Sequence, residues 1–463
     1  MVTQVHTKVM QYQKPVKVTY PDPAPTTPYT HLISNQTIAL VSQLELESGL
    51  ILEDVPVAFR TWGKLNEART NCMVICHALT GSADVEDWWG PLMGPGLVFD
   101  PTRYYIFSAN VLGSPYGTAS PVTVNPATGN RWGPEFPSTC PRDDVRLQKI
   151  ILDHLGVRSI AVVIGGSMGG MACLEWPLSS PSGYVRNIVP IATCPRHSAW
   201  GISWGEAQRQ SIYSDPKYLD GYYDQADPPA TGLAAARMAA LLTYRSRDSF
   251  ETRFGRRQVG TPSTRSGKES PEDPTSDDGL KAATLKAVAA HNDGHRLQSK
   301  LAQVPTVAVA TKPAPRHIFS AQSYLRYQGE KFVNRFDANC YIHLTRKMDA
   351  HDVDYGREGS GLAGVPEGTL VVAIDSDGLF MLGEQREMVQ EMPGAKLVVV
   401  ESRDGHDGFL LEFEQINQHV LGHLHERLSE IYKGPVTVEE PVDRFLAKKE
   451  SAFGEIEGVV TDW

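Results

Sequence analysis

Residues 159–171, SIAVVIGGSMGGM, constrain the fold more than any other part of the chain. The first half of this segment is a run rich in Ile and Val that ends in glycine, which is typical of a parallel strand buried on both faces. The run leads into Gly165-Gly166-Ser167-Met168-Gly169, a match to the G-x-S-x-G pattern. In that pattern a serine lies on a cramped strand-to-helix turn, where glycine permits close backbone approach. The segment predicts an α/β fold with Ser167 as nucleophile.

Two backbone donors for an oxyanion are predicted beside this serine. One is the N–H of Met168, at the start of the helix that follows the turn. A second predicted strand, Met73 to Cys76, leads into the loop HALTG at 77–81. Sites in open α/β sheets lie at the carboxyl ends of the strands, so the N–H of Leu79 is the predicted second donor. We expect His77 to make structural hydrogen bonds, because the base comes last in such triads.

The remaining catalytic groups are predicted near the C-terminal end of the chain. Two segments, 369–380 and 396–409, have strand character and end in titratable residues. Asp377 follows the first strand and His406 follows the second. Serine, acid, then histidine is the chain order of α/β-hydrolases and differs from those of chymotrypsin and subtilisin. His406 would accept the proton of Ser167, and Asp377 would orient the imidazole.

Other aspartates compete for the role of orienting acid. Asp375 lies on the same strand exit, and Asp404 and Asp407 flank His406. On the residues alone, any of them remains a candidate. We favour Asp377, because it leaves the strand before the histidine's strand, whereas an aspartate next to the histidine cannot readily fold back onto that ring.

Composition excludes several classes of function. The chain has 463 residues, 41% of them apolar and 21% charged, which is ordinary for a globular protein of one large domain with an insertion, or of two domains. No apolar run of about 18 residues is present, so no membrane span is expected. A net charge of −10 without a basic block argues against a nucleic-acid partner. The N-terminus lacks an apolar signal segment, so we expect a cytoplasmic protein.

The cysteines do not indicate a metal site or a disulfide framework. They are sparse and include no C-x-x-C pair, so we expect free thiols and no metal. The six are Cys72, Cys76, Cys140, Cys173, Cys194 and Cys340.

The pattern along the chain predicts a sheet that starts antiparallel and continues parallel, with crossover helices. Alternating segments 38–49 and 52–63 form a hairpin, 142–156 forms an amphipathic helix, and 413–431 carries one long amphipathic stripe. Strands are also expected at 104–114 and 185–194. The expected organisation is a lead-in (1–36), a core (37–197 and 351–433), a helical lid (198–350) with a polar insertion at about 252–315, and a tail (434–463).

Nine short motifs resemble those of one enzyme family, the homoserine O-acetyltransferases of the fungal type. The resemblance extends over roughly residues 37–425. The motifs are HALTG (77–81), GGSMGGM (165–171), RHSAW (196–200), EAQRQ (206–210), LTYRS (242–246), SYLRYQ (323–328), FDANCY (336–341), SDGLF (376–380) and GHDGF (405–409).

This resemblance implies an α/β-hydrolase fold, with a mostly parallel sheet flanked by helices and an inserted helical lid through which two chains form a homodimer. It implies ping-pong transfer of an acetyl group from acetyl-CoA, as co-substrate, to L-homoserine in methionine biosynthesis, with no bound cofactor. Carried over by motif, Ser167, Asp377 and His406 form the triad. In the same way, Arg237 and Tyr244 bind the substrate carboxylate, and Asp407 meets its ammonium group.

Arg237 and Tyr244 lie about two helical turns apart and therefore share a face. A guanidinium and a carboxylate are suitable partners for the two charges of an amino acid. The alternatives are a related O-acetyltransferase acting on serine or deacetylcephalosporin C, use of succinyl-CoA as donor, a serine hydrolase of the same fold, or a scaffold without catalysis.

Overall fold

The computed structural model describes residues 16–258 and 319–438, together with positions 281, 284, 287, 288, 291 and 292. The first part of the predicted lead-in, most of the predicted insertion and the end of the predicted tail lie outside the described residues. Within the described part, no helix combines the length and apolar character needed to cross a bilayer.

The described residues form a nine-stranded sheet. Its strands are β1 (Val18–Thr19), β2 (Thr37–Glu45), β3 (Ile51–Trp62), β4 (Cys72–Cys76), β5 (Tyr105–Ala109), β6 (Ile160–Gly166), β7 (Ile188–Ile191), β8 (Leu370–Ile374) and β9 (Lys396–Val400). They lie in the order β1-β2-β3-β5-β4-β6-β7-β8-β9. Pairing is antiparallel from β1 through β3 to β5, and parallel from β5 to β9. The predicted fold class is confirmed.

The parallel strands β4, β6, β7 and β8 are buried on both faces, as their apolar runs predict, whereas the edge strand β9 is partly exposed. In β4, Cys72, Val74 and Cys76 pack into a cluster on one face of the sheet. Met73 and Ile75 point to the opposite face and join a second cluster. This alternation is the period-two geometry of a strand, and it explains why the run has no polar side.

Helices cover both faces of the sheet. They are α1 (Val85–Trp89), α2 (Pro141–His154), α3 (Met168–Leu178), α10 (Leu382–Glu391), α11 (Gly408–Leu411), α12 (Phe413–Arg427) and α13 (Ser429–Lys433). Side chains of α2, α3 and α10 belong to the first cluster, whereas those of α1 and α12 belong to the second. The predicted helix at 142–156 is α2, which has Asp143 and Asp144 in its first turn. Gly156 follows it at a positive φ of 84°.

Three predictions of element length are wrong. The stripe at 413–431 is two helices, because the backbone at Leu428 leaves the helical region (φ −124°, ψ 36°). This turn allows Tyr432 to meet Tyr104, whose hydroxyl oxygens are 3.1 Å apart. The strand expected at 185–194 covers only Ile188–Ile191 and ends there, since the next residue, Ala192, has a positive φ of 45°. The strand expected at 104–114 covers only Tyr105–Ala109.

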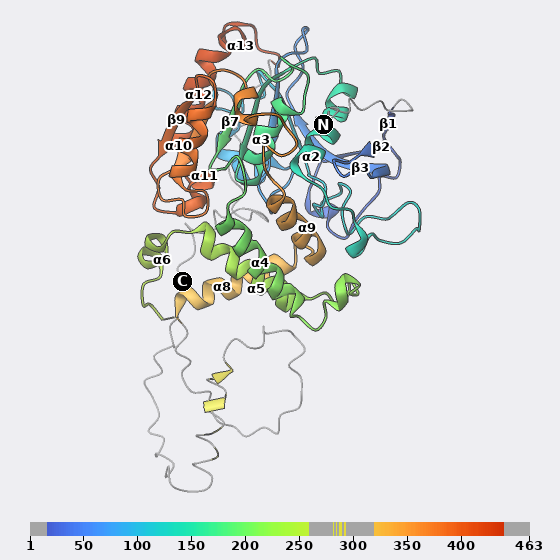
Figure 1. Ribbon diagram of the computed structural model, residues 1–463, viewed down its shortest axis with the longest axis vertical. Helices are drawn as coiled ribbons and strands as arrows, with labels where there is room; N and C mark the ends of the chain where they lie inside the picture. Colours follow the sequence, from blue (N-terminus) through green and yellow to red (C-terminus); the bar gives the residue numbers. More distant parts are fainter. Residues whose placement is uncertain are drawn as a thin grey trace, which may run out of the picture.

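The predicted lid, residues 198–350, contains α4 (Ala199–Tyr213), α5 (Ala230–Tyr244), α6 (Arg247–Arg253), α8 (Ser320–Val333) and α9 (Ala338–Asp349), here called the lid helices. Figure 1 shows α4, α5, α6 and α8 gathered beyond one end of the sheet. A third apolar cluster joins Leu79 and Met168 to Leu233, Phe332 and Tyr341 of the lid helices. The lid helices therefore pack on the loops predicted to carry the catalytic groups.

Residues 252–258, the described start of the predicted insertion, take part in this packing. α6 extends to Arg253, and Phe254 is buried with its ring 5.0 Å from that of Tyr324 in α8.

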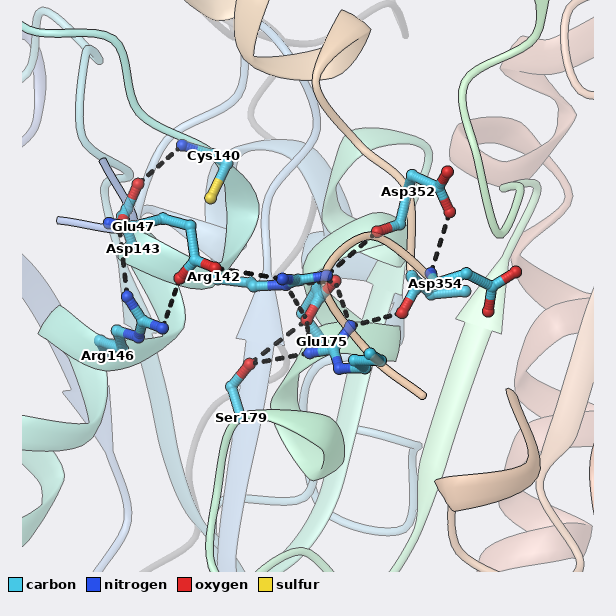
Figure 2. Close-up of polar contacts among 11 residues, drawn as sticks. Glu47, Cys140, Arg142, Asp143, Arg146, Glu175, Ser179, Asp352 and Asp354 are labelled. Atoms are coloured by element: carbon cyan, nitrogen blue, oxygen red, sulfur yellow. Dashed lines mark hydrogen bonds and ion pairs between the residues drawn. The ribbon is translucent and has the colours of Figure 1, made fainter. Parts of the chain in front are cut away.

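A buried charge network lies on the α2/α3 side of the sheet (Figure 2). Arg142 of α2 is within 3.2 Å of Glu47 and also within 3.2 Å of Glu175 in α3. Arg357 lies 2.6 Å from the same glutamate, so Glu175 has two cationic partners. These contacts join α2, α3 and the loop that follows the lid helices.

Candidate active site

Ser167 occupies a strained turn between β6 and α3. Its φ is 59° and its ψ is −125°, outside the regions that non-glycine residues favour. Neighbouring backbone holds the turn in place: the N–H of Ser167 donates to the Ile191 carbonyl at 3.0 Å. The Thr193 hydroxyl donates to the Ser167 carbonyl at 2.8 Å. The side chain of Ser167 is therefore held at the carboxyl edge of the sheet.

Glycine is required on both sides of this serine. A Cβ on Gly165 would lie 2.2 Å from the Gly169 carbonyl oxygen, and a Cβ on Gly169 would lie 2.1 Å from the Cys76 oxygen. The turn thus packs directly on the end of β4. This close approach brings Met168 and Leu79, the two predicted oxyanion donors, into one buried cluster beside Ser167.

Asp377 and His406 meet at the exits of β8 and β9. Nδ1 of His406 lies 2.7 Å from Oδ2 of Asp377. The other oxygen of Asp377, Oδ1, accepts the backbone N–H groups of Leu379 and Phe380 at 2.8 and 2.9 Å. The histidine ring is buried and lies 5.2 Å from the ring of Phe380. These contacts fix both side chains.

The rival aspartates have other partners. Asp375 accepts the N–H of Ser402 at 2.9 Å. Asp404 accepts a hydrogen bond from Arg245 at 2.6 Å. The structure therefore brings Asp377, rather than Asp375 or Asp404, to the ring nitrogen of His406.

The surroundings of His406 favour its protonated form. Burial alone lowers the pKa of this imidazole, but the negative charge and hydrogen bond of Asp377, together with the charge of Asp407, outweigh the burial. The net result is a pKa above the ordinary value of 6.5. The two carboxylates thus stabilise an imidazolium, the state a general base reaches when it takes a proton.

One pocket collects most of the predicted site residues. It encloses about 600 Å³ of empty space, its open mouth included. Its lining is Ala78, Leu79, Thr80, Gly81, Trp88, Ser167, Arg237, Tyr244, Met348, Leu379, His406, Asp407, Phe409 and Leu410. A separate hollow, lined in part by Leu178, Arg186 and Arg357, lies at the amino ends of β7 and β8 and contains none of these residues.

The predicted substrate-binding residues are buried around this pocket. Arg237 of α5 is 2% exposed, and its guanidinium carbon lies 5.5 Å from the ring centre of Tyr244. The Tyr244 ring lies 6.1 Å from that of His406. Asp407 lines the same pocket, and its Oδ2 lies 2.8 Å from Nε of Arg245. One cavity thus contains a cation that could bind the carboxylate of an amino acid and an anion that could bind its ammonium group.

His77 makes structural hydrogen bonds, as expected. Its Nδ1 is 2.8 Å from the Ala78 carbonyl, so this nitrogen carries the proton. The other nitrogen, Nε2, accepts the N–H of Val111 at 3.2 Å. Burial lowers the pKa of His77 to about 4, so the ring is neutral.

Sequence reasoning missed two arginines that contact these loops. Arg245 bonds to the loop that carries His406, and Arg335 donates to the Thr80 carbonyl at 3.1 Å. Arg245 belongs to the motif LTYRS. The available signal was that this second arginine, after Arg237, directly follows Tyr244. Arg335 precedes the motif FDANCY and had no comparable signal.

The chain matches known proteins over most of its length. The family described as alpha/beta hydrolase fold matches residues 71–413. The homoserine O-acetyltransferase of Cryptococcus neoformans var. grubii is 51% identical, over 95% of this chain and 98% of the relative. That of Ascobolus immersus is 47% identical, over 95% and 96%. The crystal structure of homoserine O-acetyltransferase from Bacillus anthracis shares the fold, with a TM-score of 0.68 at 19% identity over 84% of this chain and 97% of that one. The chain therefore belongs to the homoserine O-acetyltransferase family within the α/β hydrolases.

Proposed function

We propose that this protein transfers the acetyl group of acetyl-CoA to the hydroxyl of L-homoserine, in methionine biosynthesis, through an acetyl-enzyme on Ser167. Family membership at 51% identity supports the reaction. The observation that carries the assignment of residues is the pocket itself. Ser167 and His406 line it together with Arg237 and Asp407, two charges suited to the two ends of an amino acid, which supports the assignment.

The first half-reaction loads the enzyme. Ser167 Oγ attacks the thioester carbonyl carbon while its proton passes to Nε2 of His406. Asp377, at Nδ1, supports the tautomer in which Nε2 is free to accept that proton. The N–H groups of Leu79 and Met168 stabilise the oxyanion. The C–S bond then breaks, the imidazolium gives its proton to the departing CoA thiolate, and the acetyl group stays on Ser167.

The second half-reaction uses the same base. Arg237 and Tyr244 bind the homoserine carboxylate, and Asp407 binds its ammonium group. His406 takes the proton of the homoserine hydroxyl, and the oxygen attacks the acetyl carbon. When the intermediate collapses, the bond to Ser167 Oγ breaks and the serine regains its proton from His406. The product is O-acetylhomoserine.

The lid helices would cover the pocket and form the interface of a homodimer. Apolar side chains on the outer surface of these helices support an interface, since Trp200 is 58% exposed and Leu242 is 51% exposed. A cytoplasmic location is supported by the cysteines, all six of which are free thiols.

Release of CoA thiol, measured with and without L-homoserine, tests this function. The transferase should release one equivalent of thiol per site from acetyl-CoA alone and turn over only when homoserine is added. Mass spectrometry should find one added acetyl group on the wild type and none on Ser167→Ala. Continuous thiol release without acceptor would instead identify a hydrolase. Serine and deacetylcephalosporin C as acceptors, and succinyl-CoA as donor, test the related transferases.

A further inference from the structure

Arg245, at the C-terminal end of α5, lies on the loop that carries His406. Its Nη1 is 2.6 Å from Asp404 Oδ1, and its Nε is 2.8 Å from Asp407 Oδ2. The arginine side chain is 5% exposed and that of Asp407 is 3% exposed. One guanidinium from the lid helices thus contacts carboxylates on both sides of the histidine.

The backbone of the same segment also contacts this loop. A Cβ on Gly405 would lie 2.6 Å from the N of Ser246 and 2.9 Å from the Arg245 carbonyl carbon. Ser249 of α6 donates to Asp404 at 2.6 Å. The close approach at Gly405 and the hydrogen bond of Ser249 hold this loop against the end of α5. The position of Arg245 relative to Asp407 is therefore well defined.

A buried carboxylate needs a compensating charge. Without one, desolvation favours the neutral acid, which cannot attract an ammonium group. The Arg245 guanidinium supplies this charge to Oδ2 of Asp407. A carboxylate has further lone pairs on its two oxygens, so contact with one guanidinium nitrogen is compatible with an additional cationic partner in the pocket.

We propose that Arg245 is the positioning residue for acceptor selection: it keeps Asp407 ionised and fixed at the pocket wall, where the carboxylate binds the ammonium group of the amino-acid acceptor. This inference rests on the proposed function, because it assigns how that acceptor is recognised. Arg245 acts through Asp407 and does not itself touch the substrate.

The test compares homoserine with 4-hydroxybutanoate, an acceptor that has the same hydroxyl and carboxylate but no amino group. In the wild type, kcat/KM should favour homoserine, because only homoserine has an ammonium group that can pair with Asp407. In Arg245→Met this preference should fall about tenfold or more, mainly through the KM for homoserine. The rate of acetylation by acetyl-CoA alone should change little. Arg245→Lys keeps one charge but has no second nitrogen to span both carboxylates, so it should give an intermediate preference.

A double-mutant cycle separates positioning from general damage. Asp407→Asn should remove the same preference, and the double variant with Arg245→Met should lose no more than either single variant. The matched control is Arg142→Met. Arg142 is also a buried arginine between two carboxylates (Figure 2). Neither of these carboxylates lines the pocket. This control should keep both the acetylation rate and the acceptor preference.

Three outcomes would overturn the proposal. Arg245→Met could keep the wild-type preference for homoserine, or it could slow acetylation as much as transfer, which would mean that the arginine supports His406 alone. If Arg142→Met also loses the preference for homoserine, lost stability is sufficient to explain the result with Arg245→Met. By contrast, a wild type that forms no acetyl-enzyme would reject the proposed function, so the two failures are distinguishable.

Discussion

One carboxylate oxygen of Asp377 accepts a hydrogen bond from His406, and the other accepts hydrogen bonds from two backbone N–H groups. Oδ2 lies 2.7 Å from Nδ1 of the histidine, and Oδ1 accepts the N–H groups of Leu379 and Phe380. The carboxylate is therefore held by three donors, each of which constrains its orientation. This arrangement determines how the amide group of an asparagine at position 377 would be oriented.

Asp377→Asn should lower kcat by about 10⁴-fold in both half-reactions. The amide oxygen is expected to replace Oδ1 on the two N–H groups, so the NH₂ group faces the histidine. Nδ1 must then accept a hydrogen bond and Nε2 must carry the proton, so Nε2 cannot take the proton of Ser167. Rapid-quench measurement of the acetyl-enzyme checks this directly. Asp375→Asn is the control, and equal losses in the two variants would contradict the assignment.

The acid limb of acetylation should report His406. The ring must be neutral to accept a proton, so the rate should fall as pH decreases through the folded-state pKa, which lies above 6.5. Asp407→Asn should move this midpoint to lower pH, because the charge of Asp407 contributes to the raised pKa. Acetylation alone is the suitable measurement, since no amino-acid acceptor is present. An unchanged midpoint would mean that Asp407 does not act on the base.

The same shift affects stability with a defined sign. Because the folded state binds the proton of His406 more tightly than the unfolded state, this residue stabilises the fold fully below pH 6.5. The contribution is lost as pH rises through the folded-state pKa.

The sequence indicated the proposed triad residues more readily than the contacts that hold them. Ser167 lies in a local motif, and Asp377 and His406 follow two apolar runs, so short segments are sufficient to identify all three as candidates. The contact of Arg245 with Asp407 depends on how α5 packs on a loop distant in the chain, and no local pattern encodes that packing. Likewise, the apolar stripe at 413–431 continues through Leu428, although the backbone leaves the helical region there. The pattern of buried side chains does not reveal where the backbone turns.

Arg237→Ala should lower kcat/KM for homoserine at least tenfold. The proposed contact with the substrate carboxylate is charge-assisted and typically contributes about 1.5–3 kcal/mol. Formation of the acetyl-enzyme should hardly change, since that step does not involve the amino acid. If Arg237→Ala slows CoA release without homoserine as much as it slows turnover, the residue supports the donor site instead.

The ion pair between Asp144 of α2 and Lys347 of α9 should be important for stability. Nζ of Lys347 lies 2.6 Å from Oδ2 of Asp144 and 2.7 Å from the Leu112 carbonyl, and both side chains are at most 3% exposed. Lys347→Met should lower the free energy of unfolding by about 3–5 kcal/mol, because the remaining carboxylate is buried without its partner. Urea denaturation measures this loss. Adding Asp144→Asn should restore part of it, and a further equal loss would contradict the pairing.

Removal of residues 259–318 should preserve the acetyltransferase. Gln258 and Phe319, which flank this segment, are joined by an antiparallel bridge, and the N–H of Ser320 donates to the Arg257 carbonyl at 2.9 Å. The Cα atoms of Gln258 and Phe319 are therefore about 5 Å apart, so a short Gly/Ser linker can connect these two residues without moving α6 or α8. None of the proposed site residues lies in the segment, and a shorter connection costs less loop-closure entropy.

We expect acetylation, transfer to homoserine and Tm near those of the full chain. Two linkers of different length control for strain at the junction. If both give folded protein that forms the acetyl-enzyme but no longer transfers it, the segment takes part in acceptor binding; if both give insoluble protein, it is required for folding of the lid helices.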